Sequence, residues 1–174
     1  MPSPVRADLH GKPDSLIQGW LLFYSSLHPG VESYTNTTLL LDGSNAPQPD
    51  AMLCSTPRAH GRVWLNANGY LCGAPELVCE IAASSVSVDL HEKKRAYCRA
   101  GVQEYLVWLT QDRKVLWYSL TEGEYQPLPA DNKGLIRSLV FPGLVLDTRA
   151  LLKHDAAKGL AARRGGMTGS APRL

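Results

Sequence analysis

Two acidic residues and one lysine are the first candidates for chemistry in this chain: Asp50, Glu80 and Lys93. Glu80 is the one charged residue inside an otherwise apolar run from Leu77 to Ala83. A charged side chain on a buried strand is costly unless it is paired or binds a metal. Asp50 stands at the start of a second candidate core strand. Two carboxylates that converge on neighbouring strands can hold Mg²⁺, or Mn²⁺, because these ions prefer oxygen ligands.

A metal ion between the two carboxylates would polarise a phosphate oxygen and lower the pKa of an attacking water. Lys93 beside the ion could orient or activate that water and stabilise the negative charge that builds on phosphorus. These residue types therefore indicate a metal-dependent phosphodiesterase site, with Asp50 and Glu80 as metal ligands and Lys93 as the third catalytic residue.

The helix expected over residues 88–100 has one face suited to this site. Asp89, Lys93 and Tyr97 are spaced i, i+4 and i+8, so they share that face. If the face turns toward Glu80, Lys93 reaches the carboxylates, Asp89 positions the ammonium group and Tyr97 adds a hydroxyl. Lys94 would point about 100° away around the helix.

Each of these residues also has a structural interpretation. Asp89 and Lys93 could form a solvated ion pair worth about 0.3–0.5 kcal/mol. Asp50 follows a proline and could serve only in a turn. Glu80 could belong to a buried salt bridge. The remaining basic residues of the helix could contact DNA phosphates or form a solvated face: Lys94, Arg95 and Arg99.

Apolar periodicity and turn residues predict the elements that must position these groups. A strand, a helix and a strand follow one another within about thirty residues, which is typical of a parallel crossover. The fold class is therefore α/β (α+β), with an antiparallel hairpin after the crossover. The expected elements are a helix at 14–28, strands at 35–42 and 49–55, a hairpin at 62–71 outside the core sheet, a strand at 76–82, a helix at 88–100, a strand at 104–110, a hairpin at 114–128, an edge strand at 135–147 and a helix at 147–162.

Length and composition fit one domain. The chain has 174 residues, of which 44% are hydrophobic and 20% charged. We expect a flexible N-terminus over residues 1–12, a single domain over 13–155, and a helix end with a disordered tail over 156–174. A net charge of +2 does not by itself indicate nucleic-acid binding, so a DNA-binding patch would have to be local.

The sequence argues against several other classes. No apolar run approaches the roughly 18 residues of a membrane span, and the first residues lack the apolar core of a signal peptide. We therefore expect a cytoplasmic protein with no membrane partner. The cysteines form no CxxC pair and the histidines no HxxxH motif, which argues against zinc. A serine hydrolase would need a GxSxG elbow, and the chain has none.

At the same residues the chain resembles the Uma-type restriction endonucleases of the PD-(D/E)XK nuclease superfamily. The resemblance runs from about His10 to about Leu152. Its segments arrive in the family's order: Pro49-Asp50, Glu80-Ile81-Ala82, the helix residues Asp89, Lys93 and Tyr97, then Ala100-Gly101-Val102, Glu104-Tyr105 and the late FPGLVLD segment.

The resemblance implies a PD-(D/E)XK nuclease-like mixed β-sheet flanked by helices, a divalent metal and hydrolysis of DNA. It assigns the first acid of the motif to Asp50 and the second to Glu80. The lysine position of the superfamily, two residues after the second acid, is Ala82 here. The Uma-type family resembles this chain in moving the lysine to the helix, where Lys93 matches.

The leading hypothesis is thus a Mg²⁺-dependent DNA endonuclease that hydrolyses phosphodiester bonds with a metal-activated water. Two coordinated cuts would favour a homodimer. The alternative is a catalytically inactive nuclease-fold domain that binds nucleic acid or protein, which the alanine at position 82 motivates.

Overall fold

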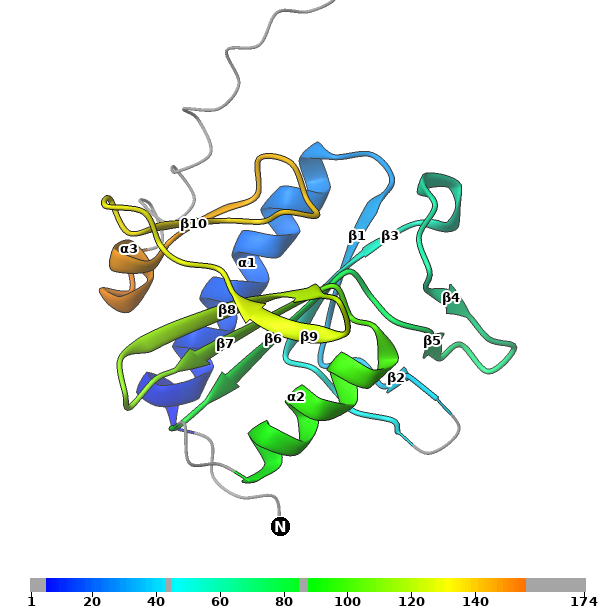
Figure 1. Cartoon of the computed structure of the whole chain (residues 1–174), viewed down its shortest axis with the longest axis horizontal. Coiled ribbons are helices and arrows are strands. Elements are labelled where there is room, and N and C mark those ends of the chain that lie inside the picture. The colour runs from blue at the N-terminus through cyan, green and yellow to red at the C-terminus, as the bar shows by residue number, and fades with distance from the viewer. Residues whose placement is uncertain (1–5, 43–44, 85–87, 156–174) are drawn as a thin grey trace, which may run out of the picture.

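A mixed β-sheet covered by one helix on each face forms the centre of the molecule (Figure 1). The computed structural model describes residues 6–42, 45–84 and 88–155. Within these residues the main sheet has six strands, in the spatial order β1 (Val31–Thr35), β3 (Ala51–Ser55), β6 (Leu77–Ala82), β7 (Glu104–Leu109), β8 (Lys114–Thr121) and β9 (Glu124–Pro127). The fold class expected from the sequence is confirmed.

The two faces of the sheet bury alternate residues of each strand, because successive side chains of a strand point to opposite faces. Leu77, Cys79 and Ile81 of β6 pack in one cluster with helix α1 (Lys12–Leu27). Val78 packs in the other cluster, with Tyr97 of helix α2 (Val88–Ala100). Glu80 has the parity of Val78, so it lies on the α2 face.

The predicted parallel crossover is confirmed. Strand β6 pairs with β7 in parallel, with Glu80 opposite Val107, and α2 connects the two strands. The near-continuous apolar sequence of β6 and β7 fits strands that are covered on both faces. The predicted hairpin after β7 is also confirmed, since β7, β8 and β9 pair antiparallel in succession.

The segment before β3 differs from the prediction of one strand over residues 35–42. Strand β1 ends at Thr35, and Asn36 has a φ of 47°, in the left-handed region that a strand cannot continue through. Past this turn, the described residues of the predicted range form the short strand β2 (Leu39–Leu40), which pairs with β5 (Leu71–Cys72). Strand β5 also pairs with β4 (Trp64–Leu65), so the predicted hairpin lies in a separate small sheet, as expected.

The C-terminal strands also differ from the prediction of one edge strand at 135–147. Strands β10 (Leu135–Arg137) and β11 (Val145–Asp147) instead form a separate antiparallel pair. The turn between them is held to the sheet by Glu104, whose carboxylate accepts hydrogen bonds from the Ser138 hydroxyl and from the backbone N–H of Leu139. These bonds fold the segment back on itself.

Shorter helices complete the described chain. Residues 7–11 form a π-helical turn, η1 (Ala7–Gly11), directly before α1, where the sequence had suggested a flexible segment. A 3₁₀ turn, η2 (Pro57–Ala59), follows β3. Helix α3 (Thr148–Leu152) begins where the Asp147 side chain accepts the N–H of Ala150. The helix expected over 147–162 is therefore wrong for residues 153–155, where a turn follows Leu152 and His154 has a φ of 55°, and its remaining residues lie past 155, outside the described residues. Within the described part of the chain, no helix has the length and apolar character needed to cross a bilayer.

Candidate active site

The pairing of β3 with β6 brings the two predicted acids together. Ala51 is opposite Cys79 in this antiparallel pair, so the register places Asp50 level with Glu80 at the next position. The Asp50 carboxylate is fixed there, because its Oδ2 accepts the backbone N–H of Ile81 at 2.6 Å. The two carboxylates therefore come from adjacent strands at one end of the β3–β6 pair.

Helix α2 supplies two groups to the second acid. Glu80 is 4% exposed, and its two carboxylate oxygens have different partners. The ammonium Nζ of Lys93 lies 3.0 Å from Oε2, and the Tyr97 hydroxyl donates to Oε1 at 2.7 Å. The i, i+4 spacing of these two residues explains the contact, since both lie on the helix face that turns toward β6.

Burial raises the pKa of both acids. Desolvation raises the pKa of Glu80 to about 7, even though Lys93 and Tyr97 favour its charged form, and the charge of Asp50 raises that pKa further. Desolvation also raises the pKa of Asp50, against the Ile81 N–H, which lowers it. Neighbouring buried carboxyls that resist ionisation would be stabilised in their charged form by a cation between them.

The donor set suits a hard divalent cation. Asp50 and Glu80 offer carboxylate oxygens, and Mg²⁺ is usually held by one or two carboxylates while keeping several waters. The described residues contain no group of three or more His, Cys, Asp or Glu side chains that could hold a metal ion. An ion at Asp50 and Glu80 would therefore depend on water and a substrate phosphate for its remaining ligands.

Two side chains beside Asp50 were missed by the sequence reasoning. His10, in the η1 turn, has its Nε2 3.8 Å from Oδ1 of Asp50. Asp14 stands one helical turn later, and its charge raises the pKa of Asp50. The signal in the sequence was the i, i+4 spacing of a histidine and an acid next to the first helix, but nothing in that segment shows which strand it will contact.

The other predicted helix residues lie apart from the carboxylates. The Lys94 ammonium sits 3.5 Å from the centroid of the Tyr118 ring, in a cation–π contact on another side of α2. Arg95 and Arg99 are exposed on the same helix. The side chain of Asp89 lies outside the described part of the structure.

Burial alone does not distinguish Glu80 from the other buried acidic residues of the sheet. Glu104 is fully buried, and its carboxylate accepts the backbone N–H of Leu139 in the 138–140 turn. The Glu76 carboxylate accepts the backbone N–H of Ser55 at 2.8 Å. Both lie at the opposite end of the sheet from Asp50. What distinguishes Glu80 is a lysine partner and a neighbouring carboxylate.

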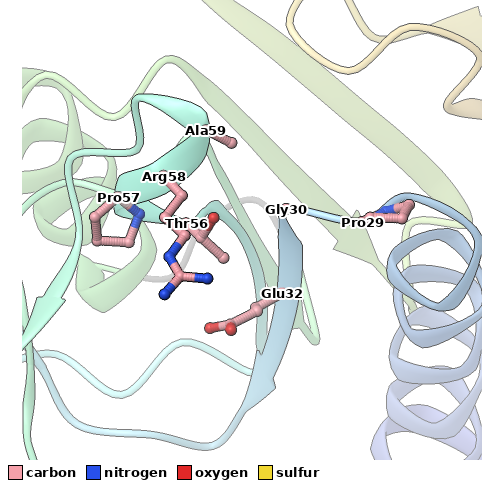
Figure 2. Close-up of a pocket in the computed structure, with 7 residues that line it drawn as sticks. All are labelled: Pro29, Gly30, Glu32, Thr56, Pro57, Arg58 and Ala59. Atoms are coloured by element: carbon pink, nitrogen blue, oxygen red, sulfur yellow. The ribbon is translucent and has the colours of Figure 1, made fainter.

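A pocket of about 680 Å³ lies at that opposite end, around the start of β1 and the end of β3 (Figure 2). Figure 2 shows the Arg58 side chain, from η2, and the Glu32 side chain, from β1, among the residues that line it. The pocket is separate from the paired carboxylates. The lining residues are Pro29, Gly30, Glu32, Thr56, Pro57, Arg58 and Ala59.

Comparison with known proteins bears on this geometry. A crystal structure of a "putative nuclease" from Anabaena variabilis superposes with a TM-score of 0.68 at 14% sequence identity, covering 88% of this chain and 86% of that one. At this identity the likeness concerns the fold. No curated protein matches the chain. The model of the Uma2 family, described as "Putative restriction endonuclease", matches residues 1–149, a span that includes every residue of the site described above. The chain, with its nuclease fold, therefore belongs to the Uma2 family.

Proposed function

We propose that this protein is an endonuclease that hydrolyses DNA phosphodiester bonds with Mg²⁺ or Mn²⁺. One observation carries the proposal: the buried Glu80 carboxylate contacts Lys93 and lies level with Asp50, in a nuclease-fold chain. Two carboxylates can hold a metal ion, and a lysine beside them can stabilise the negative charge that builds on phosphorus.

The protein's own groups would hold the reacting parts in place. Asp50 and Glu80 would bind the ion, which when present would offset the negative charge of the phosphodiester. The Ile81 N–H fixes the orientation of Asp50, and the Tyr97 hydroxyl fixes that of Glu80. The Lys93 ammonium group, which lies beside Glu80, would orient a water or a phosphate oxygen.

The position of the lysine follows from the fold. Ala82 has the parity of Glu80 along β6, so a lysine there would face the same side as the acid. Lys93 brings its ammonium group to Glu80 from the covering helix instead. We infer that Lys93 has the catalytic role that a lysine at position 82 would have, because residue 82 is an alanine. Two coordinated cuts in duplex DNA would favour a homodimer.

A second candidate is a nuclease-fold domain that binds nucleic acid or protein without cleaving it. The observation that favours it is that both Glu80 oxygens already have donors, Lys93 and Tyr97. Such a domain would use Lys93 as a structural partner of the acid and would not depend on a metal.

Cleavage of supercoiled plasmid separates the two candidates. Purified protein with Mg²⁺ or Mn²⁺ should nick or linearise the plasmid, and EDTA should stop the reaction. Asp50→Asn and Glu80→Gln should abolish cleavage. Glu76→Gln is the matched control, because it alters a buried acid far from the site, and it should leave cleavage intact. Cleavage that persists in the Asp50 and Glu80 variants would refute the proposal, and metal-independent DNA binding without cleavage would support the binding domain.

A further inference from the structure

A histidine faces the first acid from the side opposite the lysine. His10 lies in η1, which leads into α1, whereas Lys93 lies on α2. The two helices cover opposite faces of the sheet, and both begin at the end of the sheet where Asp50 and Glu80 lie (Figure 1). The carboxylate pair is therefore flanked by a nitrogen donor on each side.

The His10 imidazole is not held by its neighbour. Its Nε2 is 3.8 Å from Oδ1 of Asp50, longer than the roughly 3.2 Å limit of a good hydrogen bond. The other oxygen of Asp50 is already engaged by the Ile81 N–H. The His10 side chain is also 42% exposed, so a molecule from solvent can reach it.

A lysine and a histidine on either side of the carboxylate pair would suit an anionic substrate that is longer than a single phosphate group. A phosphate group resting on Asp50 and Glu80 through a cation has further oxygens that need donors, and the next phosphate of the same strand lies a few ångströms along. Lys93 contacts the Glu80 side of the pair. An imidazole N–H beside Asp50 can serve the other side, since phosphate contacts fix the position of a nucleic acid on its protein.

We propose that His10 is a substrate-positioning residue that donates a hydrogen bond to a phosphate of the DNA strand bound at Asp50 and Glu80. The proposal rests on the nuclease function proposed above. The N-terminal turn η1 then forms one wall of the DNA-binding site.

The competing role for His10 is that of a third metal ligand. The two roles predict different results when metal and DNA are measured separately. Mn²⁺ binding to the protein without DNA can be followed by calorimetry. DNA binding can be followed by anisotropy of a labelled duplex in Ca²⁺, which prefers oxygen ligands as Mg²⁺ does. The variants are His10→Ala, His10→Asn and, as a matched control at an exposed histidine that directly follows η2, His60→Asn.

We expect the His10→Ala variant to lose affinity for DNA and to keep its affinity for Mn²⁺. His10→Ala should weaken DNA binding by about 3- to 10-fold, the net worth of one hydrogen bond, and leave the Mn²⁺ affinity unchanged. His10→Asn should recover part of the loss, because its amide can donate. His60→Asn should match the wild type. Thermal unfolding should not change in the His10 variants, since η1 contains no buried residue.

Two outcomes overturn the proposal while leaving the nuclease intact. One is a His10→Ala variant that binds DNA as the wild type does. The other is a parallel loss of Mn²⁺ and DNA affinity, which would make His10 a metal ligand. A wild-type protein that neither binds DNA in Ca²⁺ nor cleaves it in Mg²⁺ would instead refute the proposed function, and the role of His10 with it.

Discussion

Replacing Glu80 with glutamine should make the protein more stable at pH 8 while abolishing its cleavage activity. Burial raises the pKa of Glu80 from 4.5 to about 7. One pKa unit corresponds to about 1.4 kcal/mol, so ionising this carboxyl in the folded protein costs on the order of 3 kcal/mol. Glutamine has nearly the same shape and carries no charge, so the variant avoids that cost.

The sign of the pH dependence follows from the proton count. Between pH 4.5 and 7 the folded protein keeps a proton on Glu80 that the unfolded chain has lost. Stability from this group is therefore fully present below pH 4.5 and is lost as the pH rises through 7. The Gln variant should match the wild type near pH 4.5 and exceed it at pH 8, where the difference reaches at most about 3 kcal/mol.

Urea unfolding followed by tryptophan fluorescence at the two pH values measures this difference. The m-values should agree between variants, so that the midpoints report stability alone. A Gln variant that is less stable than the wild type at pH 8 would refute the reasoning, because the attraction of Lys93 for Glu80 would then outweigh the cost of burial. Mg²⁺ should raise the thermal midpoint of the wild type at pH 8 and leave that of the Gln variant unchanged, since a ligand stabilises only the state that binds it.

Three further substitutions test contacts at the site and elsewhere in the fold. Tyr97→Phe removes the donor to Oε1 of Glu80 and should cost about 1–3 kcal/mol at pH 8 in urea unfolding. Glu104→Ala removes the acceptor of the Leu139 backbone N–H and of the Ser138 hydroxyl; it should cost about 2–4 kcal/mol and speed hydrogen exchange at Leu139. Gly73→Ala should lower the thermal midpoint more than Gly69→Ala. Both have positive φ, but a Cβ at residue 73 would lie 2.3 Å from a backbone oxygen, whereas residue 69 has open space. Equal midpoints would contradict the steric argument.

The sequence was sufficient where a feature depends on local spacing. The apolar run around Glu80 predicted β6, and the helical spacing of Lys93 and Tyr97 predicted that both would face the same direction. The structure adds that this direction is toward Glu80. Helix phase and strand alternation are fixed by nearby residues, and the contact between α2 and β6 follows from the short crossover between them.

The sequence was insufficient where a contact joins distant segments. His10 meets Asp50 only because α1 packs across β3 and β6, and no local pattern in residues 6–12 records that packing. Strand β1 was missed because its half-exposed sequence, VESYT, has little apolar signal and pairs as an edge strand. The β10–β11 pair depends on Glu104, which lies far away in the sequence.

Two adjacent lysines of α2 allow the most direct test of the proposed site. Lys93 contacts Glu80, whereas Lys94 lies over the Tyr118 ring. The measurement is the rate of plasmid cleavage in Mg²⁺ by the wild type, Lys93→Met and Lys94→Met. If Lys93 acts in catalysis, Lys93→Met should slow cleavage by about 100-fold or more, and Lys94→Met should remain within about 3-fold of the wild type. Equal rates for the two variants would contradict the assignment of Lys93 as the catalytic lysine.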